Sequence, residues 1–154
     1  MIITFSGTDG SGKSTQIEIL MSEFIRQGFR VKYVWSRGGY TPLFSALKKI
    51  LRILTAKRLP NEGNSSSRDE LLKNKSVSGV WLTIATLDLL MFYGVYVRIM
   101  SWFGMVVVCD RYIEDTLIDF KRNFPDTFDD QSFLWRLLVL FIPRPNQSFL
   151  LFVP

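Results

Sequence analysis

The sequence predicts an α/β fold in three layers, with a parallel β-sheet between helices on both of its faces. Short apolar runs alternate along the chain with longer segments whose apolar residues recur at helical spacing. A glycine-rich loop also stands between the first apolar run and the first helical segment. Strands that alternate with helices form parallel sheets, whose ligand sites lie at the carboxyl ends of the strands. The chain has 154 residues, and we expect a single domain over residues 1–154.

The first third of the chain alternates between strand and helix signals. Residues 2–6 are apolar and predict a buried strand. A helix follows, because apolar residues recur at intervals of three or four, and Gly28 stands where a C-terminal cap is expected. Residues 30–35 alternate like a second strand. Three further segments are expected, a turn, an amphipathic helix and a flexible loop, at residues 36–42, 42–54 and 55–67.

A long apolar helix is expected over residues 68–103, with a break near residues 76–79. Residues 77–97 are long and apolar enough to cross a bilayer. A single crossing would place the glycine-rich loop and Asp110 on opposite sides of the membrane. We therefore favour a buried core helix or a dimer-interface helix over a membrane span.

The last third of the chain predicts two strands and two helices. A fully buried strand is expected over residues 105–109, after Gly104 has ended the long helix. A helix is expected over residues 114–124, and Asp130 is expected to cap another helix that ends at Phe141. Residues 149–153 predict the final strand.

The composition excludes several kinds of chemistry. Lysine and arginine exceed aspartate and glutamate by 19 to 14, which suits an anionic ligand but also an ordinary solvated surface. The absence of histidine excludes Ser-His-Asp hydrolysis and histidine-ligated zinc. The single cysteine, Cys109, cannot form an intrachain disulfide, so we expect a reducing compartment, the cytoplasm. We expect neither a nucleic acid nor a membrane as a partner.

The loop from Gly7 to Ser14 matches the pattern G-x-x-x-x-G-K-[ST] in full, after a strand and before a helix. Glycines let the backbone curl so that its N–H groups face a phosphate chain, and the helix start adds its positive end. In this pattern Lys13 reaches the outer phosphates, and the Ser14 hydroxyl binds a magnesium ion. We therefore expect a fold of the P-loop NTPase type, with a turn that matches by chance as the alternative.

The strand that ends in Asp110 supplies a second element of such a site. Its carboxylate can hold the magnesium shell from the side opposite the loop. ATP-hydrolysing proteins usually place a second carboxylate next, whereas this chain has Arg111, which binds phosphate and cannot act as a base. The Asn-Lys-x-Asp motif of GTPases is also absent. These features favour phosphoryl transfer to a bound acceptor, with a structural salt bridge from Arg111 to a helix as the alternative.

Four stretches of the sequence resemble the thymidylate kinase family of P-loop nucleoside monophosphate kinases. They are GTDGSGKSTQ (7–16), SRGGYTPLFSALKKIL (36–51), CDRY (109–112) and FLLFVP (149–154). The second stretch is similar to the family's Arg-x-Pro-Gly-Gly-Thr turn, with its proline absent and Tyr40 in place of threonine. The likeness covers nearly all of the chain at the level of element order.

The resemblance implies that ATP and Mg²⁺ are used and that a nucleoside monophosphate accepts the phosphoryl group. ATP is then expected to bind at Gly7, Thr8, Asp9, Gly10, Ser11, Gly12, Lys13, Ser14 and Thr15. In such kinases a carboxylate like Asp9 contacts the sugar hydroxyl of the acceptor, whereas an Asp9 that caps a turn is the structural alternative. Arg37 and Arg111 would hold the acceptor phosphate. The catalytic residues implied are Lys13, Arg111 and Asp9, and the magnesium ligands are Ser14 and Asp110.

The sequence departs from the family at several places. Residues 87–89 read Leu-Asp-Leu where the family has Ala-Asp-Arg, so an arginine for the acceptor phosphate is missing, and Arg98 lies further along. Residues that help the family select thymine are replaced. Asp115 and Asp119 occupy two of these positions. They share one helix face, which either faces the acceptor site or is a solvated acidic surface. The family continues with an arginine-rich lid beyond the position of Pro154, so we expect either a fragment or a loss of the lid.

The leading expectation is a phosphotransferase of nucleotide biosynthesis that passes the γ-phosphoryl group of ATP to dTMP or a related nucleotide. One alternative is a kinase of the same fold that acts on another small-molecule acceptor. The other is a nucleotide-binding protein without turnover. The apolar long helix makes a homodimer a further expectation.

Overall fold

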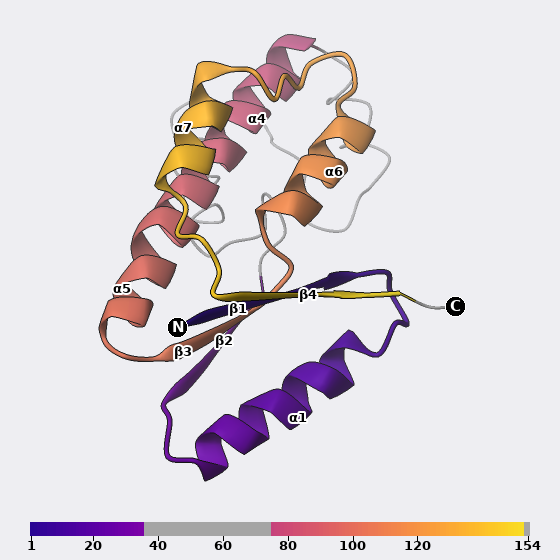
Figure 1. Ribbon diagram of the computed structural model, residues 1–154. Coiled ribbons are helices and arrows are strands. Elements are labelled where there is room, and N and C mark those ends of the chain that lie inside the picture. Colours follow the sequence, from indigo (N-terminus) through magenta and orange to yellow (C-terminus); the bar gives the residue numbers. More distant parts are fainter. Residues whose placement is uncertain (36–74, 153–154) are drawn as a thin grey trace, which may run out of the picture.

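The computed structural model describes residues 1–35 and 75–152, so the segments expected over residues 36–67 and the expected start of the long helix at residues 68–74 lie outside the described residues. Its strands are β1 (Ile2–Gly7), β2 (Val31–Trp35), β3 (Val106–Asp110) and β4 (Gln147–Leu151). They form one sheet in the order β2-β3-β1-β4, and all neighbouring strands run parallel (Figure 1). The parallel α/β fold predicted from the sequence is confirmed.

The register of the sheet brings the ends of its strands together at one edge. β1 and β2 both pair with β3, and Phe5 and Trp35 both lie opposite Asp110. β4 pairs with the other side of β1, where Leu151 lies opposite Gly7. All five residues of β3 are buried, as expected of a central parallel strand. The glycine-rich loop therefore starts at the same edge at which β3 delivers its aspartate.

Helices cover both faces of this sheet (Figure 1). α1 (Lys13–Arg26) lies on one face, over Val106 and Val108 of β3. The other face is covered by α4 (Lys75–Leu89), α6 (Ile113–Asn123) and α7 (Phe133–Phe141). Val107 and Cys109 belong to the core on that side. Successive side chains of a strand point to opposite faces, so β3 alone contributes to both hydrophobic cores.

The long apolar helix is continuous from Lys75. α4 passes into a π-helical stretch, η1 (Leu90–Val97), and then into α5 (Arg98–Trp102). The break expected near residues 76–79 is wrong, because these residues lie in the first turns of α4. The irregularity of the helix is the wider winding of η1.

This helix has the length and apolar composition of a membrane span, which by themselves are weak evidence for one. One stripe of it is fully buried, at Ala85, Leu89, Tyr93 and Val97. These residues follow one another at intervals of four and pack in the core above the sheet. Such a stripe is typical of a core helix in a globular protein.

The last third of the chain agrees with the sequence prediction except at the start of α7 and in the bounds of the final strand, which was expected over residues 149–153 and lies at Gln147–Leu151. The expectation that Asp130 caps α7 is wrong. Ser132 holds the cap position instead. A turn precedes the helix, because the N–H of Ser132 donates a hydrogen bond to the carbonyl of Asp129. Asp130 instead forms an ion pair with Lys121 of α6 at 2.5 Å. The expected helix end at Gly28 is confirmed, with φ of +85° at that glycine.

Candidate functional site

The glycine-rich loop begins at a residue that has no room for a side chain. Gly7 has φ of +143°, and a Cβ atom there would lie 2.3 Å from the carbonyl oxygen of Leu151 in β4. Gly10 and Gly12 have φ of +84° and +80°, in the left-handed region that glycine adopts without strain. The glycines therefore allow the chain to leave β1 beside β4 and to curl into α1.

The start of α1 is open to an anion. The helix begins at Lys13, and the residue before it, Gly12, supplies no side-chain cap. The first N–H groups of a helix have no partner within the helix, and they carry its positive partial charge. A phosphate group is a suitable acceptor for them.

Lys13 is buried at the base of the loop. Its Nζ donates hydrogen bonds to the carbonyl oxygens of Gly7 and Thr8, at 2.8 and 2.7 Å. An ammonium group has three donors, so one remains for a ligand. The side chain thus holds the loop in its curled form and keeps a positive charge beneath it.

Asp9 and Arg111 form an ion pair across the loop. The guanidinium Nη2 of Arg111 lies 2.9 Å from Oδ1 of Asp9, whose side chain is 90% exposed. Arg111 has φ of +75°, which is rare for a residue with a side chain, and its N–H donates to the carbonyl of Phe5 at 2.9 Å. The salt bridge of Arg111 is thus made to the loop and not to a helix.

Asp110 presents one bonded and one unbonded oxygen. The hydroxyl of Tyr33 donates to Oδ2 of Asp110 at 2.9 Å. Burial, together with this bond and the charge of Asp110, raises the pKa of Tyr33 to about 12, so its hydroxyl stays protonated at neutral pH. The other oxygen, Oδ1, is buried and has no hydrogen-bond partner among the described residues.

This arrangement fits a magnesium ion. The unbonded Oδ1 of Asp110 and the Ser14 hydroxyl are hard oxygen donors, and both residues line the same cavity. Among the described residues no cluster of three His, Cys, Asp or Glu side chains could hold a metal alone. Mg²⁺ usually takes one or two protein ligands and completes its shell with water and substrate phosphates.

The loop, β2 and β3 enclose a cavity of about 360 Å³. It is lined by Asp9, Gly10, Gly12, Lys13, Ser14, Thr15, Trp35, Asp110 and Arg111. Most of the residues that the sequence predicts for the site are therefore brought together. Arg37 lies outside the described residues.

Sequence reasoning missed two residues of this site, Tyr33 and Trp35. Both belong to β2 and are two positions apart, so they lie on the same face of the sheet. A signal was present, because the carboxyl end of a parallel strand beside β3 must reach the edge at which Asp110 lies. Which strand neighbours β3 was not evident from the sequence.

Asp115, whose role the sequence left open, makes internal hydrogen bonds. Its Oδ2 accepts a bond from the Ser6 hydroxyl at 2.6 Å and another from the N–H of Tyr112 at 3.1 Å. These contacts tie the first turn of α6 to the end of β1. Asp119 lies one turn further along the same helix and is partly exposed.

Three curated proteins resemble the chain in sequence. A thymidylate kinase of Symbiobacterium thermophilum is 30% identical over 123 residues, which is 77% of this chain and 47% of that protein. A putative ankyrin repeat protein of fowlpox virus is 31% identical over 64% of this chain and 17% of its own length. A thymidylate kinase of Halothermothrix orenii is 43% identical over 51 residues, 33% of this chain and 24% of that protein. No protein-family model matches the chain.

The fold resembles a crystal structure of a thymidylate kinase from Ehrlichia chaffeensis. The TM-score is 0.53 at 23% identity, and the match covers 98% of this chain and 74% of that one. At this identity the likeness concerns the fold. The chain spans about half the length of the Symbiobacterium relative and less of the other two.

Proposed function

We propose that this chain is a nucleoside monophosphate kinase of the thymidylate kinase family, to which its sequence is similar and whose fold it resembles. In this proposal it transfers the γ-phosphoryl group of ATP to dTMP or a related nucleotide. Residues 1–154 are the N-terminal part of one P-loop kinase domain, which acts in the cytoplasm. The observation that carries the proposal is the cavity in which the phosphate loop, Asp110 and Arg111 face one another.

The donor site uses the loop and the start of α1. The backbone N–H groups near Gly12 and the ammonium of Lys13 bind the phosphates of ATP. Ser14 and the unbonded oxygen of Asp110 hold the Mg²⁺ ion that accompanies ATP. When bound, this ion neutralises charge on the outer phosphates.

The acceptor site uses Asp9 and Arg111, with Arg37 as a third residue. A guanidinium can bind two phosphate oxygens through parallel hydrogen bonds, so an acceptor phosphate can compete with Asp9 for Arg111. The released carboxylate of Asp9 can then accept a hydrogen bond from the acceptor sugar. An acceptor phosphate is already ionised, so catalysis requires alignment and charge neutralisation rather than a general base.

One observation favours a different acceptor. Leu89 occupies the helix position at which the resembling kinases carry an arginine for the acceptor phosphate, and it is fully buried. This residue can neither bind an anion nor reach the site. A kinase of the same fold with another small-molecule acceptor is therefore the second candidate.

Calorimetric titration with ATP and Mg²⁺, followed by a coupled phosphotransfer assay over several acceptors, tests these alternatives. The acceptors are dTMP, other nucleoside monophosphates and hydroxylated small molecules. Transfer to dTMP or a near relative supports the leading proposal, and transfer only to a non-nucleotide supports the second candidate. Tight ATP binding without transfer to any acceptor would indicate a nucleotide-binding protein without turnover.

A further inference from the structure

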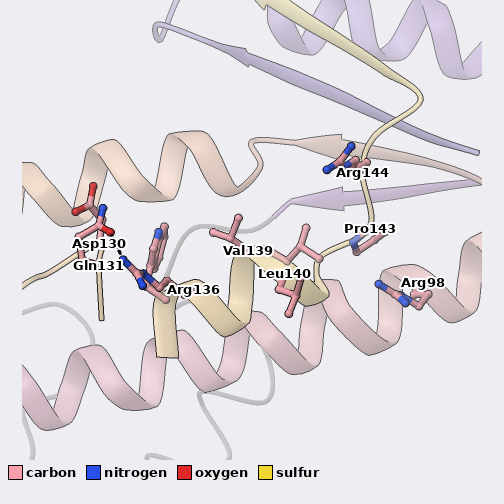
Figure 2. A pocket seen from close by; sticks show the side chains of 10 residues that line it. Arg98, Asp130, Gln131, Arg136, Val139, Leu140, Pro143 and Arg144 are labelled. Carbon is pink, nitrogen blue, oxygen red and sulfur yellow. Dashed lines mark hydrogen bonds between the residues drawn. The ribbon is translucent and has the colours of Figure 1, made fainter. Parts of the chain in front are cut away.

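A second cavity lies away from the phosphate loop. Its volume is about 670 Å³, within the range of small-molecule sites, and it shares no lining residue with the first cavity. Residues before α7, the outer face of α7 and the segment from α7 to β4 form its wall, together with Arg98 (Figure 2). This segment leads into the first residue of β4, whereas the phosphate loop adjoins Leu151 at the end of β4. The two cavities therefore lie toward opposite edges of the sheet.

The wall of this second cavity carries uncompensated positive charge. Arg98, Arg136 and Arg144 line it, and its one carboxylate, Asp130, forms an ion pair with Lys121 at 2.5 Å. Within residues 1–35 and 75–152, none of the three arginines forms an ion pair. Arg136 donates a hydrogen bond to a side-chain amide oxygen, which leaves its charge in place.

Arg98 lines the cavity, and its guanidinium is engaged by a neutral backbone carbonyl rather than by a carboxylate. Its Nη2 donates a hydrogen bond to the carbonyl of Phe141, at the negative end of α7, and so offsets the charge that would repel an anion there. Its Nε is buried and has no hydrogen-bond partner among the described residues. The charge of this guanidinium therefore remains in place beside the cavity, and a guanidinium is a suitable partner for a carboxylate or a phosphate.

An apolar strip separates the arginines. Val139 and Leu140 of α7 line the cavity, and these two residues are 54% and 77% exposed. In Figure 2 they lie between Arg136 at one end and Arg98 and Arg144 at the other. An inorganic anion would leave this strip in water, whereas a ligand with an apolar body would cover it.

We propose that this second cavity binds an organic anion that joins a phosphate or carboxylate group to an apolar body. The acidic group lies at Arg98 and Arg144, and the apolar body lies along Val139 and Leu140. The proposal does not depend on the proposed kinase activity, because no residue is shared between the two sites.

Calorimetric titration of the 154-residue chain with four probes tests this site. The probes are hexyl phosphate, hexanoate, inorganic phosphate and hexanol. We expect hexyl phosphate or hexanoate to bind at least about tenfold more tightly than the last two, since only they use both parts of the wall. The comparison of the first two identifies the preferred acidic group. Equal affinity for all four probes would overturn the proposal.

Two substitutions at exposed positions locate the binding. Arg144→Gln removes a charge and Leu140→Glu introduces a repulsive one, and each is expected to weaken binding about tenfold or more. Arg26→Gln is the matched control, because Arg26 lies on α1 across the sheet and is expected to leave binding unchanged. Unchanged affinity in both test variants, with circular dichroism as the check of folding, would overturn the site.

Amide chemical shifts separate this site from the phosphate loop, which can also bind a phosphate group. Addition of hexyl phosphate is expected to shift the amide resonances of residues 136–142 and of Arg144. Shifts confined to residues 7–15 would place the ligand in the kinase site and would overturn the proposal.

Discussion

The guanidinium of Arg111 lies 2.9 Å from the carboxylate of Asp9, although the two residues are 102 positions apart in the chain. The pair joins the phosphate loop to the end of β3. Asp9 is almost fully exposed, and exposed ion pairs contribute little to stability, so a phosphate can displace it readily. The pair therefore holds Arg111 beside the cavity, and under the proposed function an acceptor phosphate would displace Asp9 from it.

Replacement of Asp9 tests whether its carboxylate serves the acceptor while the rest of the loop serves ATP. In Asp9→Ala we expect the KM for the acceptor to rise about tenfold, with little change in the KM for ATP, because the proposed function assigns this carboxylate to the acceptor. Steady-state kinetics with each substrate varied in turn measure the effect. The exposed Asp126→Ala is the control for loss of a negative charge. Equal changes in both KM values would argue against a role for Asp9 at the acceptor.

Loss of the Lys13 ammonium should reduce turnover strongly. We expect Lys13→Ala to lower kcat about a thousandfold, because the charge that stabilises the transferring group is lost. Lys32→Ala removes an exposed lysine from β2 and should leave kcat unchanged. Circular dichroism is needed beside the kinetics, since Lys13 also bonds to two loop carbonyls. A folded Lys13→Ala protein with normal turnover would remove Lys13 from the mechanism.

Tyr33 is expected to act as a positioning residue for the carboxylate of Asp110. Its hydrogen bond occupies Oδ2 and leaves Oδ1 for the metal. Removal of such an outer contact typically weakens metal binding by tenfold or more, so Tyr33→Phe should raise the Mg²⁺ concentration for half-maximal activity about tenfold. Tyr96→Phe, which likewise removes one phenol hydroxyl, is the matched control and should leave the Mg²⁺ requirement unchanged. An unchanged magnesium requirement in Tyr33→Phe would show that Asp110 needs no such support.

The raised pKa of Tyr33 also predicts a loss of stability at high pH. The folded protein holds this proton up to a pKa of about 12, whereas the unfolded chain releases it near 10. Between these values the folded state binds more protons, so the contribution is intact below pH 10 and is lost as the pH rises toward 12. Urea unfolding at several pH values should show a smaller decline in Tyr33→Phe than in the parent chain. An equal decline in both would contradict the assignment.

Cys109 is expected to be unreactive in the folded protein. The residue is fully buried in β3, and burial raises the pKa of its thiol to about 12. At pH 8 the thiol is neutral and inaccessible, whereas a reagent such as DTNB attacks exposed thiolates. We expect no labelling of the native chain and one thiol labelled per chain in guanidinium chloride. Rapid labelling of the native protein would mean that β3 opens easily.

Local chemistry in the sequence predicted the strands and the curled glycine-rich loop, whereas contacts between distant segments could not be read from it. The glycine pattern and the apolar run before Asp110 each lie within a few neighbouring residues, so their meaning is local. The role of Tyr33 depends on β2 being the neighbour of β3, which only the sheet order reveals. The start of α7 was misjudged for the same reason, because Asp130 is engaged by Lys121 of another helix.

Gly7 should tolerate no side chain, because the backbone of β4 fills the space. A Cβ atom there would lie 2.3 Å from the carbonyl oxygen of Leu151, and the φ of +143° adds strain. We expect Gly7→Ala to lower the free energy of unfolding by about 3 kcal/mol. Gly10→Ala is the matched control, since Gly10 also has a positive φ but open space around it, and it should cost about 1 kcal/mol. Urea denaturation measures both values, and equal losses would mean that β4 does not press against the start of the phosphate loop.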